Sequence, residues 1–168
     1  MPRRRPIREK KHRLPRPSYQ GEVLVTFTAC TAHQKPSLAA TSIVERCVNF
    51  LAEAAQQHHC TVPIYCFMPD HLHVMLWGRS AAADTWRAMV RFKQRSGYWL
   101  SQSGQSVRWQ KDFYDHVLRP HENWRRQVRY IAENPVRAGL VGRWDRYPFT
   151  GAIGHDREAV VRRTGWRP

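Results

Sequence analysis

Four stretches of the chain have the residue pattern of β-strands, and the third of them alternates between its two faces with the two-residue period of a strand. They span residues 21–30, 61–68, 71–77 and 107–119, and the last of them is irregular. In the first stretch, Val23, Val25 and Phe27 share one face. Pro69 and Asp70, a pair typical of a tight turn, separate the second stretch from the third. The pattern therefore predicts four strands, the middle two of them joined by a short turn.

Three other stretches carry apolar residues at the three- and four-residue spacing of amphipathic helices. They span residues 41–59, 83–102 and 122–134. Thr41 or Ser42 can cap the first helix, and Asp84 can cap the second. The third helix is expected to end before Pro135, because a residue that precedes a proline is pushed out of helical geometry.

The predicted elements follow one another as β-α-β-β-α-β-α. This order matches a ferredoxin-like split βαβ sandwich of the α+β class, with an antiparallel sheet and helices packed on one face. A chain of 168 residues suits a single domain, which we place at residues 18–141. We expect a basic, flexible arm at residues 1–17 and a loosely docked, Arg-rich tail at residues 142–168. Many unrelated functions use this fold, so function must be argued from the site.

The charge balance indicates a polyanionic partner. The chain carries 28 Lys and Arg against 13 Asp and Glu, a formal net charge of +15, and such a surface attracts the phosphates of nucleic acids. The arm alone holds eight basic residues and one acid. The cations that we expect to bind DNA lie in the arm and in the second predicted helix: Arg3, Arg4, Arg5, Arg8, Lys10, Lys11, Arg13, Arg16, Arg87, Arg91, Lys93 and Arg95.

An anionic membrane is the second candidate partner, and the sequence argues against it. The arm lacks the amphipathic helix that a membrane-surface segment needs, and no later run reaches the ~18 apolar residues of a membrane span. The cysteines form no C-x-x-C pair, so we expect buried, reduced thiols rather than zinc ligands or disulfides. They are Cys30, Cys47, Cys60 and Cys66. We therefore expect a cytoplasmic protein.

Two histidines stand one residue apart in the third predicted strand. Residues i and i+2 of a strand project from the same face, so His71 and His73 can ligate one metal ion. Leu72, Val74 and Leu76 form the opposite, apolar face. Taken alone, this pattern fits a metal site and a pair of surface histidines equally well.

A tyrosine and an amide stand one turn apart in the third predicted helix. Tyr130 and Asn134 are four residues apart and so lie on one side of the helix, with Gln127 near them. Singly, Tyr130 can also be a tyrosine at the edge of the core, and Asn134 can simply end the helix. The alternatives leave unexplained why both accompany a histidine pair and a surface that attracts polyanions.

Together these groups suffice for one reaction. A tyrosine phenolate can attack a backbone phosphate and form a covalent phosphotyrosine. A divalent ion held by two imidazoles and an amide oxygen would neutralise charge at that phosphate. Because all of these ligands are neutral, the site would hold Mg²⁺ weakly and Mn²⁺ better. We expect cationic charge, from the ion or from Arg126 and Arg129, to favour the phenolate.

Three blocks, "MPDHLHVML", "FYDHVLR" and "YIAENPVRAGLV", resemble the REP-associated tyrosine transposases, which belong to the HUH single-strand nucleases and are related to the IS200-type transposases. The resemblance covers residues 21–150. It implies that His71 and His73 bind the metal, that Tyr130 is the nucleophile, and that Asn134 is the third ligand or a polar group near the metal. It also implies a bacterial protein, associated with the nucleoid, that cuts single-stranded DNA near REP hairpins and leaves a 5′-phosphotyrosine and a free 3′-OH.

The chain departs from that family at two points. Asp70 stands where the family more often has Asn, and this carboxylate can tighten the ion or cap the turn. The segment "YPFTGA" replaces a serine-rich segment of the family, which puts any role of that segment in doubt.

The competing interpretation is a non-catalytic protein that binds DNA or RNA hairpins. RNA-recognition modules share this element order, but the strands lack their block of aromatic residues. The intact set of two histidines, a tyrosine and an asparagine favours the enzyme. We expect a monomer, with a dimer as the alternative.

Overall fold

The computed structural model describes residues 13–104 and 107–165. Its strands are β1 (Leu24–Cys30), β2 (Cys60–Met68), β3 (His71–Gly78), β4 (Tyr114–Val117) and β5 (Thr150–Ile153). Its α-helices are α1 (Thr41–Gln57), α2 (Thr85–Gln102), α3 (Trp124–Arg137) and α4 (Arg157–Arg162). Short 3₁₀ turns are η1 (Arg16–Tyr19), η2 (Ala32–Gln34) and η3 (Trp144–Arg146).

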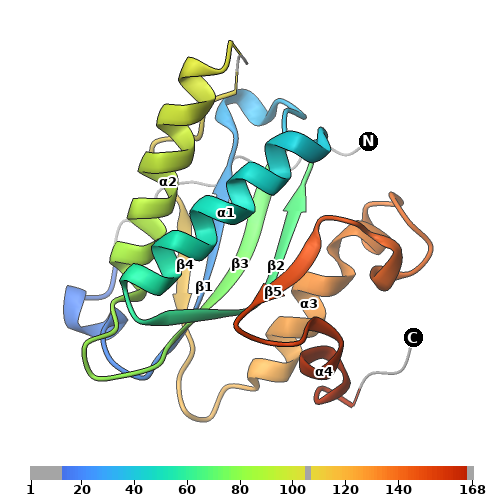
Figure 1. The fold of residues 1–168 in the computed structure, drawn as a ribbon. Helices are drawn as coiled ribbons and strands as arrows, with labels where there is room; N and C mark the ends of the chain where they lie inside the picture. The colour runs from blue at the N-terminus through green and yellow to red at the C-terminus, as the bar shows by residue number, and fades with distance from the viewer. Residues whose placement is uncertain (1–12, 105–106, 166–168) are drawn as a thin grey trace.

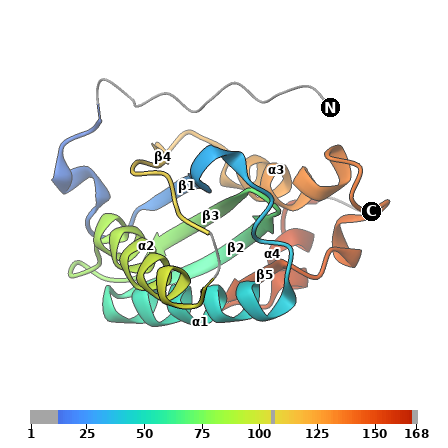
Figure 2. The ribbon, with the colours of Figure 1, turned by 90° about the horizontal axis from the view of Figure 1, so that it is seen from above.

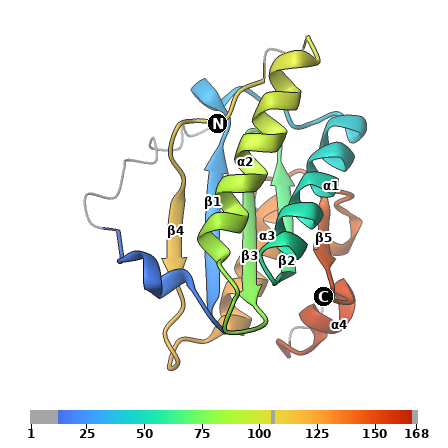
Figure 3. The ribbon, with the colours of Figure 1, turned by 60° about the vertical axis from the view of Figure 1, so that its left-hand side comes forward.

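The strands form one antiparallel sheet in the order β4-β1-β3-β2-β5, which Figure 3 displays from edge to edge. β3 lies between β1 and β2 and pairs with both of them. β1, α1 and β2 thus form a βαβ unit that is split by β3, as do β3, α2 and β4 around β1. The predicted class, α+β with an antiparallel sheet in ferredoxin-like order, is confirmed.

The helices differ from the expectation in one respect, because they cover both faces of the sheet. α1 and α2 pack on one face, while α3 and α4 pack on the other (Figures 1 and 2). The second layer exists because the central strands are apolar on both sides. Ile64, Cys66 and Met75 are buried against Val128 and Ile131 of α3. Placing α3 on this face brings it over the histidines of β3.

α3 also continues past the residue at which the sequence predicts its end. Pro135 lies inside the helix and is buried, and the helix ends at Arg137. The carbonyl of Tyr130 accepts hydrogen bonds from the side chains of Asn134 (2.8 Å) and Arg137 (3.1 Å). The side chain of Asn134 is thereby held within the helix rather than at its end.

The described part of residues 142–168 is docked on the sheet, contrary to the expected loose tail. β5 pairs with the outer edge of β2, which would otherwise expose unpaired backbone groups. Trp144, Tyr147 and Val160 are buried. The hydroxyl of Tyr147 donates to the carbonyl of Phe67 at 2.8 Å. This segment therefore completes the face on which α3 lies.

The end of the predicted arm is likewise part of the fold. The guanidinium of Arg13 lies 4.9 Å from the Trp86 ring and 5.0 Å from the Phe113 ring. Arg13 also forms an ion pair with the buried Asp115. Arg16 stacks on Trp86 at 4.8 Å. Arg13 and Arg16 are thus engaged within the protein, whereas residues 1–12, with Arg3, Arg4, Arg5, Arg8, Lys10 and Lys11, lie outside the described residues.

Candidate active site

The sheet face beneath α3 carries a polar row that crosses three strands. His73 of β3 pairs with Thr28 of β1, and Thr28 pairs in turn with Tyr114 of β4. His71 lies two residues from His73 and shares its face, as the strand period predicts. Both imidazoles are buried, with 3% and 7% of their residue surface exposed. Buried imidazoles need hydrogen-bond partners, and Asp70 and Thr28 are among those that supply them.

The two imidazoles are held so that one nitrogen of each points at the other. Nε2 of His71 and Nε2 of His73 are 3.1 Å apart. Nδ1 of His71 lies 2.5 Å from Oδ1 of Asp70, and Nδ1 of His73 lies 2.9 Å from Oγ1 of Thr28. A carboxylate only accepts, so the proton of a neutral His71 sits on Nδ1 and its Nε2 presents a lone pair.

That lone pair can accept a proton from Nε2 of His73, and the two histidines would equally be suited to hold a divalent cation. The hydroxyl of Thr28 can accept or donate, so it is compatible with both states. Two convergent imidazole nitrogens, each backed by an oxygen on the far side of its ring, form the arrangement typical of metal-ligating histidines. The residues present therefore fit a divalent cation.

Asp70 lies directly beside the ring of His71. Oδ1 of its carboxylate contacts Nδ1 of that ring. Its backbone carbonyl accepts from both the amide and the hydroxyl of Thr31 (2.9 and 3.0 Å). Asp70 is therefore anchored by the loop after β1 and orients His71 from behind.

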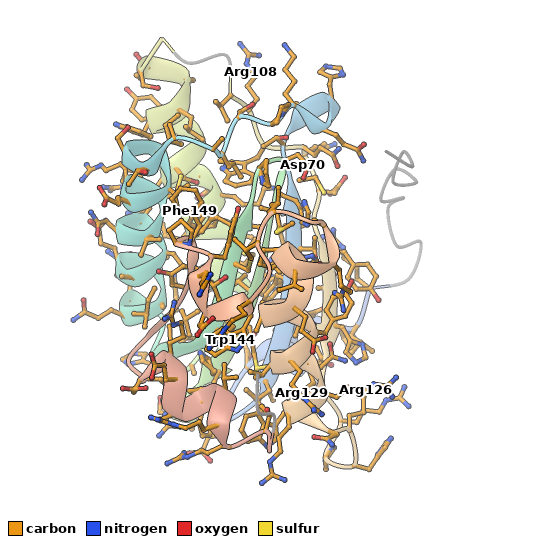
Figure 4. All side chains as sticks on the ribbon, turned by 90° about the vertical axis from the view of Figure 1, so that its right-hand side faces the viewer. Asp70, Arg108, Arg126, Arg129, Trp144 and Phe149 are labelled. Atoms are coloured by element: carbon orange, nitrogen blue, oxygen red, sulfur yellow. The ribbon has the colours of Figure 1, made fainter. Side chains whose placement is uncertain are left out.

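α3 presents Tyr130 to the histidine pair. The rings of Tyr130 and His73 have their centroids 5.8 Å apart at 79°, and Tyr130 is 45% exposed. The cation nearest its ring is the guanidinium of Arg137, at 4.2 Å from the centroid among the described contacts. Figure 4 shows Arg126 and Arg129 toward the end of α3 that is remote from Asp70. The sequence argument named Arg126 and Arg129 but not Arg137. Arg137 lies two turns after Tyr130, on the same side of the helix.

Asn134 is buried beneath Tyr130, and its Nδ2 donates to the Tyr130 carbonyl. The amide oxygen is therefore the atom of this side chain that is suited to a cation. Within residues 13–104 and 107–165, no three His, Cys, Asp or Glu side chains cluster as metal ligands. The amide side chains of Asn134 and Gln127 are candidates for a third protein ligand beside the two histidines, and Gln127 lines the pocket.

An open pocket of about 550 Å³ brings together Asp70, His71, His73, Gln127 and Tyr130, whereas Asn134 is not among the residues that line it. Sequence reasoning did not identify five polar residues that line it: Thr26, Thr28, Gln34, Tyr114 and His116. Alternation along β1 and β4 assigns four of them to a sheet face, but only the strand order shows that this face is the one with the histidines. Gln34 is the last residue of η2, in which His33 and Gln34 both have positive φ. This conformation has no reliable sequence signal for these residue types.

The basic residues of α2 do not join the pocket. α2 packs against α1 and η1, on the opposite face of the sheet from His71 and His73. Arg87 forms an ion pair with Asp84, and Arg95 with Glu53. Arg91 also lies on this helix.

Backbone carbonyls engage the ammonium group of Lys93, for which the sequence predicts contact with DNA. Its Nζ donates to the carbonyls of Gln110, Lys111 and Asp112 at 2.7, 2.9 and 3.3 Å. Burial lowers the pKa of Lys93 to about 8. A side chain that spends its donors on backbone carbonyls has none left for a phosphate.

Comparison with known proteins bears on this geometry. Residues 21–133 match the sequence model of the family described as Transposase IS200 like. A REP-associated tyrosine transposase of Escherichia coli (strain K12) is 28% identical over 83 residues, which make up 49% of this chain and 48% of that protein. The match thus spans about half the length of the relative.

The fold has a relative among solved structures. The structure of a REP-associated tyrosine transposase bound to a REP hairpin superimposes with a TM-score of 0.68 at 20% identity, covering 84% of this chain and 81% of that one. No helix within the described residues is long and apolar enough to cross a membrane.

Proposed function

The chain belongs to the IS200-like transposases, and we propose that within this family it is a metal-dependent endonuclease and strand transferase for single-stranded DNA. It acts at REP-type hairpins and forms a covalent 5′-phosphotyrosine on Tyr130. The observation that carries the proposal is the position of Tyr130 over His73, whose Nε2 converges with that of His71.

Tyr130 is suited to nucleophilic attack by its exposure and its surroundings. Its ring is half exposed in the pocket, so a phosphate can approach the hydroxyl. In cleavage, the phenolic oxygen bonds to phosphorus and the bond from phosphorus to the 3′ oxygen breaks. The phosphotyrosine retains the energy of the broken phosphodiester, so a free 3′-OH can reverse the step without ATP.

His71, His73 and the amide oxygen of Asn134 would hold the cation, either Mg²⁺ or Mn²⁺. When bound, the cation supplies positive charge that polarises the phosphate and offsets charge in the transition state. Asp70 and Thr28 contribute by fixing the two rings, because ligands whose rotation is restricted lose less entropy on binding. Imidazole nitrogens favour Mn²⁺ over Mg²⁺.

The proposed partner is single-stranded DNA that folds into an imperfect-palindrome hairpin. The net charge of +15 supports a nucleic acid partner, and the structural relative is a transposase bound to a REP hairpin. We further propose that the protein acts as a monomer in the bacterial cytoplasm, at the nucleoid.

One experiment separates the enzyme from a protein that only binds hairpins. The protein is incubated with Mn²⁺ and end-labelled single-stranded DNA that carries a REP sequence from its host genome. We expect a protein–DNA adduct that survives denaturation, together with a shorter strand ending in a 3′-OH. Hairpin binding without adduct or cut product, across the REP sequences of that genome, would identify the non-catalytic alternative.

Removing the carboxylate behind His71 is expected to weaken cation binding. In Asp70→Ala, the ring of His71 loses the acceptor that fixes its orientation, and such losses cost about 10- to 100-fold in metal affinity. Titration of Mn²⁺ by calorimetry measures the affinity, and the Mn²⁺ concentration for half-maximal cleavage should rise in parallel. Asp70→Asn retains an oxygen acceptor and serves as the matched variant, with a smaller loss. Equal Mn²⁺ affinities for wild type and Asp70→Ala would show that this carboxylate does not support the ligand.

The basic residues that precede the described part of the chain are expected to contact phosphates. Deleting residues 1–12 should weaken hairpin binding and flatten the slope of log K against log salt by about 0.7 to 0.9 per lost contact. The deletion stops at residue 12 because Arg13 and Arg16 are engaged within the fold. A variant with the same twelve residues in shuffled order keeps the charge and should bind as wild type does. An unchanged slope after deletion would show that the segment makes no phosphate contact.

A further inference from the structure

Cleavage of a phosphodiester needs a proton for the departing 3′ oxygen as well as a nucleophile. In the proposed function, Tyr130 supplies the nucleophile. His71 and His73 have their Nδ1 atoms committed to Asp70 and Thr28, and their Nε2 atoms converge where the cation would bind. None of these groups is placed to protonate the leaving oxygen, so that task falls to another side chain of the pocket.

His116 is the remaining histidine that lines the pocket. Along β4, Asp115 faces the opposite side, where it accepts a hydrogen bond from Tyr19 at 2.6 Å. Alternation therefore turns His116 toward the sheet face that carries His71 and His73. It pairs with Thr26 of β1, one step along the sheet from the row that contains His73. Among side chains, imidazole is the one whose ordinary pKa suits it to give and take a proton near neutral pH.

A carboxylate fixes the orientation of the His116 ring. Nε2 of His116 lies 2.8 Å from Oε1 of Glu122, the sole hydrogen-bond partner of this ring within the described residues. The backbone N–H of Arg119 donates to the other oxygen of Glu122 at 2.7 Å. The Arg119 bond, followed by the His116 bond, lowers the pKa of Glu122. Glu122 therefore accepts the Nε2 proton and leaves Nδ1 as the exchanging nitrogen.

His116, Glu122 and the nucleophile Tyr130 share one continuous surface. Glu122 and Tyr130 both line a second hollow beside the main pocket. The hollow and the main pocket adjoin, because Gln127 and Tyr130 line both of them. A phosphate between Tyr130 and the histidine pair would thus have His116 on the β4 side of the same pocket.

We propose that His116 is the general acid of cleavage and the general base of rejoining, with Glu122 as its positioning residue; this rests on the function proposed above. As the bond from the Tyr130 oxygen to phosphorus forms, the bond from phosphorus to the 3′ oxygen breaks and its electron pair stays on that oxygen. The 3′ oxygen takes the Nδ1 proton of the imidazolium. The phenolic proton passes to solvent, and solvent reprotonates the imidazole. In rejoining, Nδ1 takes the proton of the attacking 3′-OH.

A substrate with sulfur in place of the bridging 3′ oxygen at the scissile phosphate tests the proton transfer directly. A thiolate leaves without a proton, because its pKa is far below that of an alcohol. Adduct formation is measured in single turnover with the oxygen and the sulfur substrates. For His116→Gln, we expect a rate about 100-fold below wild type with the oxygen substrate and a rate equal to wild type with the sulfur substrate.

Two further variants sharpen the result. Glu122→Gln should show a smaller defect with the oxygen substrate and none with the sulfur substrate. His121→Gln, at an exposed position that the pocket does not include, should match wild type on both. Equal slowing of His116→Gln on both substrates would overturn the proposal, since it would mean that His116 only binds the strand. If wild type forms no adduct with either substrate, the proposed function itself fails.

Discussion

Replacing Tyr130 with phenylalanine is expected to abolish adduct and cut product while leaving hairpin binding unchanged. The variant removes one oxygen and keeps the ring, so the contacts of that ring with His73 and with Arg137 remain. Loss of the nucleophile should lower the cleavage rate by on the order of 10⁴-fold or more. The adduct is quantified on a denaturing gel with labelled DNA, and binding is measured with the same hairpin.

Tyr114→Phe provides the matched control for Tyr130→Phe. Tyr114 lines the same pocket and is 41% exposed, close to the 45% of Tyr130. It lies on β4, however, where Thr28 of β1 stands between it and His73. We expect Tyr114→Phe to form the adduct at the wild-type level. If the adduct persists in Tyr130→Phe, and peptide mapping locates the nucleotide on Tyr114, the nucleophile is on the strand rather than on the helix.

The parts of the site that could be predicted from sequence are those set by local periodicity. A two-residue period assigns His71 and His73 to one strand face, and a four-residue period assigns Tyr130 and Asn134 to one helix side. Both periods hold in the structure, within β3 and α3. The contact between His73 and Tyr130 depends on which face of the sheet α3 covers. No local pattern determines that choice.

The residues that sequence reasoning missed depend on pairing between distant strands. Thr28 is one of several threonines until β1 is aligned with β3, which puts it beside His73. β5 has four residues and includes a glycine, so its pattern is too short to identify as a strand. It becomes one because β2 offers an open edge. The contacts of Lys93 are hidden from sequence for a related reason, since basic composition does not distinguish a solvated lysine from one that binds backbone carbonyls.

Replacing either histidine of the pair is expected to remove metal-dependent cleavage and to spare hairpin binding. His71→Ala or His73→Ala leaves one imidazole nitrogen where two converge at 3.1 Å, so Mn²⁺ affinity should fall by more than the ~100-fold that loss of a supporting residue causes. Calorimetric titration with Mn²⁺ reports this loss independently of catalysis. His121→Ala removes an exposed histidine outside the pocket and should leave Mn²⁺ binding and cleavage intact.

Chelation of the cation is the complementary test on the unaltered protein. Because imidazole nitrogens suit Mn²⁺ better than Mg²⁺, wild-type cleavage should stop in excess chelator and recover on addition of Mn²⁺, and less fully with Mg²⁺. Hairpin binding should persist in chelator, since it depends on phosphate contacts of basic residues. Full cleavage in excess chelator would refute the metal assignment. The convergent Nε2 atoms of His71 and His73 would then be explained by a hydrogen bond between the two rings.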